Sequence, residues 1–390
     1  MDGKELQKSR VKLFRDTANF VKTERVPHFA NVVTWKVFDA GYTLDQAMTH
    51  FDVMEETVTR FLDTYPVDAI LDVGIRNQFN VTEAFGGEGY YYYTPEVLGV
   101  RDHAHCTPDT LSDYMDDPIR YAWEKILPEK YGEVWETRDK AIWKKTFKEY
   151  VRYVMFVLHM AKVMKRYGLP SLAPNNPMSG TIIPGMEILM SDLLGIQQLS
   201  IAMRRCPDKL DDFIARWEKE KLDPVIEKTR NAPGPQTEKY CFDASILMLA
   251  HTIMNKKQFE RFYWPKFSEL LGAYRDKQMN VRIFAEGSIL SFADYFADFP
   301  RGTLTFHLEQ DDPFDFRAAA PNAGIMGGMT TDLLSNGTEA DCLAYAEKLC
   351  AELGGLGGYI FSENKMLSYR NDAKRENMLA VCRFVSDYRL

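Results

Sequence analysis

The regular alternation of short strand-like runs with long helix-like stretches constrains this fold most. Helical patterns such as 141–167 and 209–231 separate short apolar runs along most of the 390 residues. Such frequent alternation favours parallel βαβ units in the α/β class. About eight strand candidates in roughly 320 residues predict a (β/α)8 TIM barrel, with an open doubly wound sheet as the alternative. The candidate strands include 67–73, 181–184, 239–243, 280–286, 302–307, 324–329 and 358–363.

Two further segments complete the predicted organisation. Residues 1–65 read as an N-terminal helical extension packed on the barrel, and Thr43 with Gln46 forms a capping-box pattern that opens one of its helices. Residues 66–390 form the barrel itself. A long excursion at about 76–128, after the first strand, has the length of a lid or binding loop.

Charge and cysteine usage exclude several classes of protein. The net charge is -8 and no block of basic residues opposes it, so neither a nucleic-acid groove nor an anionic-membrane patch is expected. No apolar run approaches the roughly 18 to 20 residues of a membrane span. The six cysteines are scattered, which favours reduced thiols and a cytoplasmic location. The GxGxxG and GxxxxGK[ST] nucleotide-binding fingerprints are absent.

Polar residues at predicted strand ends are the candidates for chemistry. Glu286 and His307 end two consecutive candidate strands, and neighbouring strand ends in a barrel lie close together. A carboxylate and an imidazole placed in this way suit either two of three ligands of an open metal site or a general acid/base pair. A buried ion pair that closes the barrel mouth is the third interpretation. Asp72, Asp243 and Glu363 are the other strand-end carboxylates.

Aromatic residues make up 13% of the chain, and some of them fall near these positions. The run Tyr90, Tyr91, Tyr92 and Tyr93 cannot all be core, because successive side chains of a strand face opposite ways. We expect part of this run, with Phe284, to line a ligand pocket. The segment His103-Ala-His105-Cys106 resembles a metal clip, but no second ligand cluster lies near it in the sequence, and a loop held by hydrogen bonds is the alternative.

Several motifs taken together resemble the uroporphyrinogen decarboxylase superfamily, which includes methyltransferases that exchange methyl groups with corrinoid proteins. The resemblance is diffuse over about 22–390. It is carried by the order of RVP at 25–27 with GY at 41–42, LG at 194–195 through RCPDKL at 205–210, MNKKQFE at 254–260 with YWP at 263–265, GIMGGM at 324–329 and NDAKREN at 371–377.

Departures from the family patterns point to one branch. The decarboxylases resemble one another in an Arg-rich RQAGR signature that grips porphyrin carboxylates, whereas residues 32–41 here read VVTWKVFDAG. Coenzyme M methyltransferases bind zinc through His-x-Cys and a later Cys, whose places here hold Phe284-Ala-Glu286 and Phe361-Ser362-Glu363. The chain is more similar to the O-demethylase methyltransferases of the vanillate and veratrole type, which carry a Glu…Glu-x20-His zinc pattern.

The resemblance therefore implies zinc bound by Glu286 and His307. The first glutamate of the pattern falls on Leu271, which leaves the third ligand open among Asp243, Glu269 and Glu363. Strand-end placement favours Asp243 or Glu363.

The implied activity is methyl transfer from an aryl methyl ether to the cob(I)alamin of a separate corrinoid protein, with Glu286, His307 and Asp243 as the catalytic residues. Zinc would stabilise the charge that develops on the ether oxygen. The expected partners are the corrinoid protein and a small aromatic methyl ether, and a homodimer stays open. The alternatives are a decarboxylase that uses Asp72 or Asp243 and a non-catalytic member of the fold that binds a small molecule or tetrapyrrole.

Overall fold

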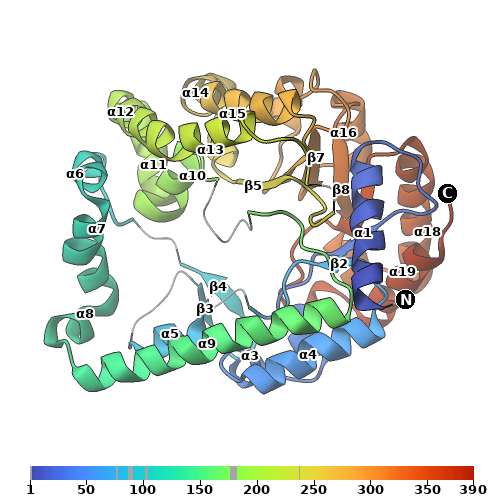
Figure 1. Ribbon diagram of the computed structural model, residues 1–390, viewed down its shortest axis with the longest axis horizontal. Coiled ribbons are helices and arrows are strands. Elements are labelled where there is room, and N and C mark those ends of the chain that lie inside the picture. The colour runs from blue at the N-terminus through green and yellow to red at the C-terminus, as the bar shows by residue number, and fades with distance from the viewer. Residues whose placement is uncertain (1, 76–77, 87–90, 102–103, 176–181, 237) are drawn as a thin grey trace.

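The central element of the computed structural model is a seven-stranded, wholly parallel sheet (Figure 1). The model describes residues 2–75, 78–86, 91–101, 104–175, 182–236 and 238–390. The strand order is β2-β1-β9-β8-β7-β6-β5. These strands are β1 (His28–Ala30), β2 (Ala69–Ile70), β5 (Ala244–Met248), β6 (Val281–Ala285), β7 (Leu304–Leu308), β8 (Gly324–Met329) and β9 (Tyr359–Glu363), and a separate antiparallel hairpin joins β3 (Tyr91–Tyr93) to β4 (Leu98–Val100).

Helices surround the sheet and connect its strands (Figure 1). They are α1 (Gly3–Ala18), α2 (Trp35–Asp39), α3 (Leu44–Ala47), α4 (Phe51–Thr64), α5 (Phe79–Ala84), α6 (Leu111–Asp116), α7 (Pro118–Tyr121), α8 (Leu127–Thr137), α9 (Lys140–Arg166), α10 (Gly185–Ile188), α11 (Gly195–Arg205), α12 (Pro207–Trp217), α13 (Asp223–Arg230), α14 (Lys256–Phe262), α15 (Trp264–Asp276), α16 (Pro313–Ala319), α17 (Thr331–Asn336), α18 (Glu339–Lys348) and α19 (Arg375–Asp387).

The sheet agrees with a TIM-barrel-like architecture, but within the described residues it has seven strands and does not close into a barrel. Next to the edge strand β5, the chain at Ser171 and Leu172 accepts hydrogen bonds from the amides of Cys241 and Phe242. This segment enters the position that an eighth strand would take, and it leads into residues outside the described part. The predicted strand at 181–184 begins outside the described residues, and 182–184 are not a strand.

The N-terminal segment is more than a helical extension. The predicted capping box of Thr43 and Gln46 is present at the start of α3. However, β1 lies within residues 1–65 and pairs with both β2 and β9. The sequence analysis missed this strand because it has only three residues. The segment therefore belongs to the sheet itself.

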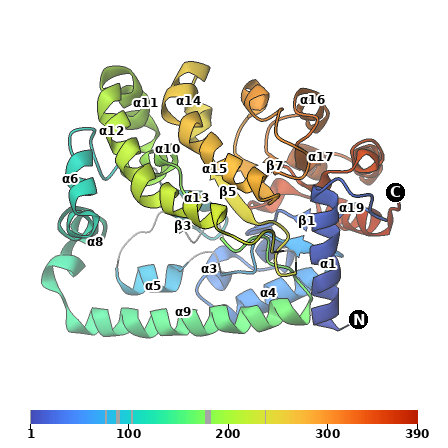
Figure 2. The ribbon, with the colours of Figure 1, turned by 45° about the horizontal axis from the view of Figure 1, so that its top comes forward.

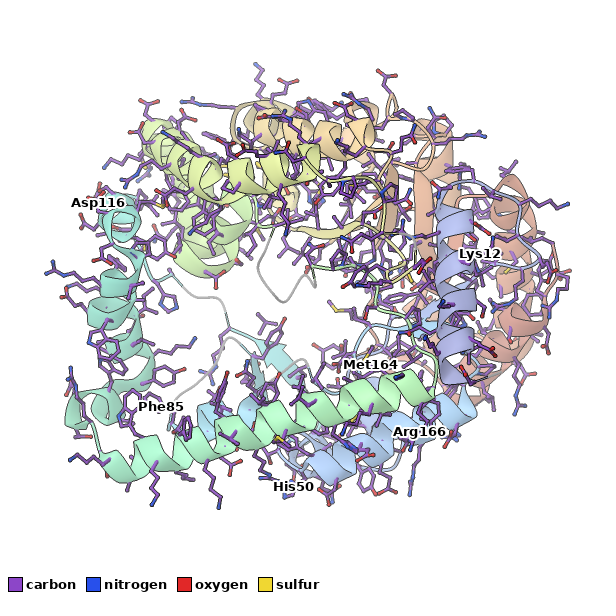
Figure 3. All side chains as sticks on the ribbon, in the orientation of Figure 1. Lys12, His50, Phe85, Asp116, Met164 and Arg166 are labelled. Atoms are coloured by element: carbon purple, nitrogen blue, oxygen red, sulfur yellow. The ribbon has the colours of Figure 1, made fainter. Side chains whose placement is uncertain are left out.

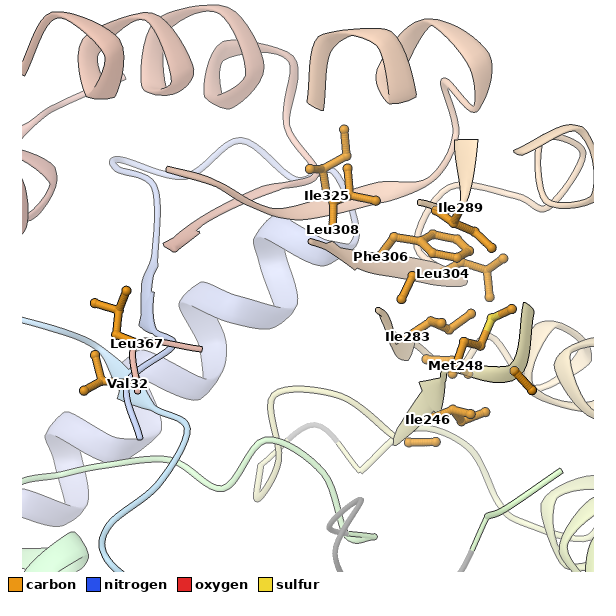
Figure 4. Packing of buried hydrophobic residues seen from close by; sticks show 14 of the residues in the cluster. Val32, Ile246, Met248, Ile283, Ile289, Leu304, Phe306, Leu308, Ile325 and Leu367 are labelled. Carbon is orange, nitrogen blue, oxygen red and sulfur yellow. The ribbon is translucent and has the colours of Figure 1, made fainter. Parts of the chain in front are cut away.

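The core lies between the sheet and its outer helices. Figure 4 shows Ile246, Ile283, Phe306 and Ile325 from four successive strands packed in one layer, and all four side chains are fully buried. The register aligns them, since Ile246 lies opposite Ile283, which lies opposite Phe306. Alternate residues of the same strands consequently face the inside of the curved sheet, where the polar groups described below meet.

The predicted excursion after β2 is an arm with structure of its own. It carries α5, the β3–β4 hairpin and helices α6 to α8, and the chain returns along α9 (Figure 2). Helix α5 packs extensively on α9, Phe51 of α4 stacks on Phe156 of α9, and the carboxy-terminal end of α9 reaches α1. The arm therefore extends away from the sheet and presents much of α9 to solvent.

Candidate functional site

Glu286 occupies the carboxyl end of β6, as the sequence predicts. Its amide donates to the Met248 carbonyl at 3.0 Å, which holds it beside the end of β5, and its side chain is exposed. Gly287 follows with φ of +71°, and a Cβ there would lie 2.8 Å from the Thr252 side chain. The turn therefore requires glycine, and the Gly287 amide donates to Glu309 Oε2 at 2.5 Å.

A second carboxylate beside Glu286 was missed by the sequence analysis. Glu187 of α10 is 5% exposed and accepts hydrogen bonds from the amides of Leu249 and Ala250 and from the Tyr263 hydroxyl, at 2.8 Å from the latter. Burial, with a smaller contribution from the negative charge of Glu286, raises its pKa to about 7, although the three hydrogen-bond donors lower it. The signal in the sequence was a lone glutamate within the apolar stretch GMEILM.

The environment of Glu187 is that of an acid able to exchange a proton near neutral pH. Glu187 is the buried member of a pair of neighbouring carboxylates, and the exposed Glu286 helps to raise its pKa. The pair comes from adjacent segments at the carboxyl end of the sheet, where barrel enzymes place their chemistry. This is the arrangement of a general acid/base site.

An unsatisfied histidine lies next along the same segment. His251 is 1% exposed, and neither of its ring nitrogens has a partner within hydrogen-bond geometry among the described residues, although the backbone of Ser288 lies near the ring. Burial lowers the pKa of His251 to about 4, so the ring is neutral. A buried polar group without a partner costs about 1 to 3 kcal/mol, which favours a ligand or water at this position.

His307 lies inside the curved sheet and is fully buried. Arg282 Nη2 donates to its Nδ1 at 2.7 Å, so Nδ1 carries no proton, and Nε2 lies 3.1 Å from the carbonyl of Glu363. The ring is thus the neutral Nε2–H tautomer, which donates to that carbonyl. Burial, and then the charge of Arg282, lower the pKa of His307 well below its ordinary value. Both nitrogens are engaged by the protein itself.

Arg282 organises this interior and was also missed. It donates to Ser245 Oγ at 3.1 Å as well as to His307, and burial lowers its pKa to about 10. Phe284, predicted to line the pocket, packs edge-on against His307 with ring centroids 5.0 Å apart and is 6% exposed. Arginine within the otherwise apolar strand VRIFA was the available signal, since a buried cation requires partners.

Glu363 faces away from His307. The preceding Ser362 places Oγ 3.4 Å from His307 Nε2, and adjacent strand residues point to opposite faces. The buried Glu363 carboxylate instead accepts from the Asn31 amide at 2.6 Å and lies 3.3 Å from His28 Nε2. The sequence correctly placed Glu363 at the end of β9, but it did not predict toward which face of the sheet the side chain points.

Asp243 lies at the opposite end of the sheet. The predicted strand 239–243 is wrong, because β5 begins at Ala244 and Asp243 therefore precedes the strand. Two hydrogen bonds of 3.0 and 3.1 Å join it to Arg15 of α1, and both side chains are buried. Along the strand direction, Asp243 and Glu286 are six residues apart, which corresponds to about 20 Å. Asp243 holds the N-terminal helix to the base of the sheet.

The predicted zinc ligands therefore do not fit a zinc ion together. Glu286 is at the mouth, His307 has both nitrogens engaged, Glu363 turns outward and Asp243 lies at the far end. Glu269, the remaining candidate, pairs with Lys266 and Arg230 on the surface of α15. No three His, Cys, Asp or Glu side chains come together as a metal site in the described part of the chain.

A buried ion pair follows β2. Lys36 Nζ lies 3.3 Å from Asp72 Oδ2, and the two residues are 1% and 8% exposed. The Gly74 amide donates to Asp72 Oδ1 at 3.0 Å. The predicted strand-end carboxylate is thus present at the carboxyl side of the sheet, with Lys36 as its partner.

The tyrosine run forms the β3 strand of the arm, apart from Tyr90, which lies outside the described residues. Tyr92 is exposed beneath the Arg101 guanidinium, whereas Tyr91 and Tyr93 are half-buried. The hairpin is tied to the carboxyl side of the sheet, because Glu96 pairs with Arg370, which follows β9. Whether these rings contact a ligand stays a prediction.

The candidate metal clip at 103–106 is described only in part. His103 lies outside the described residues, and His105 Nδ1 is 3.4 Å from Glu129. Cys106 is buried, its amide donates to the Leu193 carbonyl at 2.7 Å, and burial raises the pKa of its thiol. The described part of this segment is a loop held by hydrogen bonds.

Comparison with known proteins establishes the fold. In the described part of the chain no helix combines the length and apolarity of a membrane span. No family model and no curated protein matches the sequence. Among solved structures the chain is similar to a methyltransferase from Methanosarcina mazei, with a TM-score of 0.58, 12% identity and coverage of 98% of both chains. The chain therefore shares the α/β fold of that methyltransferase over almost its whole length.

Proposed function

We propose that this chain is a methyltransferase that takes a methyl group from an aryl methyl ether for a cobalamin held by a separate corrinoid protein. The observation that carries the proposal is Glu187, a buried acid with a pKa of about 7 at the carboxyl end of the sheet. The sequence resemblance and the fold shared with a solved methyltransferase support the same reaction class.

Glu187 supplies what this reaction needs in the absence of the predicted zinc ligands. The methyl–oxygen bond breaks, its electron pair stays on the oxygen, and the methyl carbon bonds to the acceptor. A phenol has a pKa of about 10, as in tyrosine, so an acid with a pKa near 7 transfers its proton to the phenolate with a gain of about 4 kcal/mol. Reduced cobalamin, when bound on its own protein, supplies the nucleophile. Water then restores the proton of Glu187.

The neighbouring residues set the state of this acid. Burial is the main cause of the raised Glu187 pKa and the negative charge of Glu286 adds to it, while Tyr263 and the two backbone amides fix the carboxyl group in place. The unsatisfied His251 ring offers a neutral hydrogen-bonding group for a ring substituent of the donor.

The test uses free cob(I)alamin and 2-methoxyphenol, with methylcobalamin formation followed by absorbance. We expect Glu187→Gln to lower the rate by about 10²-fold or more, the usual contribution of a general acid. A methoxyarene whose phenol is strongly acidic, such as a nitro-substituted one, needs no proton, so the loss should shrink for that donor. An equal loss for both donors, or none for either, would refute Glu187 as the acid.

The pH profile gives an independent readout. The rate should fall as the pH rises through about 7, because Glu187 then loses its proton. Glu286→Gln removes the repelling charge, so the fall should begin at lower pH. No methyl transfer by the wild-type protein, to free cob(I)alamin or to a reduced corrinoid protein, would refute the function itself.

The buried Lys36–Asp72 pair favours a decarboxylase as the second candidate. A lysine ammonium beside a carboxylate at the strand ends can hold and protonate a carboxylated substrate. Release of CO2 without any corrinoid, lost in Asp72→Asn, would support this second reaction. A protein that binds such compounds without turnover in either assay would be a binding member of the fold.

A further inference from the structure

The outward side of α9 carries a stripe of exposed apolar and aromatic side chains. Their exposed fractions run from 39% to 68%, and their spacing of three and four residues places them on one side of the helix. The opposite side buries Phe156, Met160 and Val163. The stripe extends about 22 Å along the helix. Its members are Trp143, Phe147, Tyr150, Val151, Met155 and Leu158, and we call it the α9 face.

The α9 face is continuous with other exposed apolar residues of the arm. Figure 3 shows side chains along α9 projecting beyond the edge of the molecule. Ile119 and Trp123, on the segment that precedes α8, are 82% and 46% exposed. Single exposed apolar residues are ordinary, but a contiguous group with a polar rim marks an interaction surface.

The rim of the α9 face is strongly basic. The helix contains eight lysine and arginine residues and a single acidic residue, Glu149, in a chain whose net charge is -8. Arg152 pairs with Glu149, whereas Lys144, Lys145 and Lys148 are exposed without an ion pair to any described residue. The helix therefore has an excess of seven positive charges around an apolar stripe.

We propose that the α9 face binds a partner protein whose own surface presents an apolar centre surrounded by carboxylates. Complementary charge around an apolar centre steers such partners together and fixes their register. Helix α9 is already folded and its opposite side packs against the rest of the protein, so binding costs little conformational entropy. The inference does not depend on the proposed methyl transfer.

Two other occupants fit less well. A second copy packed by twofold symmetry would bring one α9 face against another, and its seven excess charges would meet like charges. An anionic membrane requires apolar side chains that are free to enter the lipid. Trp143 instead packs against Phe85 and Trp135, with ring centroids 4.9 and 5.9 Å apart, as a rigid anchor of the kind found at protein interfaces.

The experiment uses the full-length protein and two labelled amphipathic helical peptides of 20 residues. One has leucine on one side and glutamate on the other, and the second has lysine in place of glutamate. We expect the glutamate peptide to bind at least tenfold more tightly by fluorescence anisotropy, and its binding to weaken as salt rises. A stripe of this size is smaller than a standard interface, so a micromolar Kd is expected.

Variants connect the binding to the α9 face. Phe147→Ser with Met155→Ser should weaken binding of the glutamate peptide at least tenfold, and so should Lys144→Glu with Lys148→Glu. The matched control, Leu356→Ser with Tyr369→Ser, removes equally exposed apolar side chains elsewhere and should change nothing. Circular dichroism verifies that each variant is folded.

Three outcomes would overturn the proposal. Equal binding of both peptides, or binding unchanged in the α9 variants, contradicts a basic apolar site. Sedimentation with phosphatidylglycerol vesicles that is lost in Phe147→Ser with Met155→Ser, without binding of the glutamate peptide, assigns the face to a membrane. A dimer in light scattering that the same variant dissociates assigns it to a second copy.

Discussion

Replacing Glu187 by glutamine should change how the stability of the protein depends on pH. The Glu187 pKa is raised from 4.5 to about 7 in the folded protein. Between these values the folded state holds a proton that the unfolded state releases, so folding stability falls as the pH rises. A shift of this size amounts to about 3 kcal/mol, present below the unfolded pKa and lost once the pH passes about 7.

The glutamine variant has no titrating group at this position, so the assay compares the pH dependence of the stability of the wild type with that of the variant. Urea unfolding of both proteins should be followed at several values between pH 5 and pH 8. Glu218 has a pKa raised to about 7 as well, so only the difference between wild type and variant reports on Glu187. We expect the stability of the wild type relative to the variant to fall by about 2.5 kcal/mol over this range, or about 3 °C in Tm for a chain of this length.

Glu286→Gln is the matched control at the neighbouring strand end. It removes a charge that raises the Glu187 pKa, so the loss of stability should be smaller and be complete at a lower pH. Stability curves of wild type and Glu187→Gln that run parallel from pH 5 to pH 8 would refute the raised pKa, and with it the acid role proposed for this side chain.

Three further predictions concern the other strand-end residues. Asp243→Asn leaves the buried Arg15 without its anion and should cost about 3 to 5 kcal/mol of stability in urea, while methyl transfer per folded molecule stays unchanged because the site is about 20 Å away. His307→Ala should leave the zinc content in elemental analysis at the wild-type value, and loss of one equivalent of zinc would contradict the engaged tautomer described above. His251→Leu removes an unsatisfied buried ring and should raise Tm without substrate while weakening donor binding, so a lower Tm would indicate a partner for that ring.

Strand identity was predictable wherever an apolar run was bounded by glycine or polar residues. Predicted strand 324–329 coincides with β8, and 302–307 differs from β7 by one or two residues. At β5 the prediction was displaced by several residues, because 239–243 and 244–248 both contain apolar residues and only pairing with β6 selects the second. That displacement moved Asp243 from one end of the sheet to the other.

The candidate site was less predictable than the fold. The direction in which a side chain points, and its protonation state, depend on partners that are distant in the sequence. The position of Glu286 followed from its strand. His307 is hydrogen-bonded by Arg282, which lies on the neighbouring strand. The face toward which Glu363 points depends on where β9 begins, and the predicted start differed from the observed one by one residue. Glu187 lies in the short helix α10 and not at the end of a strand, so a search restricted to strand ends did not find it.

The ion pair between Arg15 and Asp243 also determines when helix α1 can pack during synthesis of the chain. Its two partners are 228 positions apart, so α1 leaves the ribosome long before its anchor exists. At translation rates of 5 to 20 residues per second the interval is roughly ten to fifty seconds. During this time Phe14, which the finished fold buries completely, has no sheet to pack against. Helix α1 can therefore take its final place only after the chain has been made as far as Asp243.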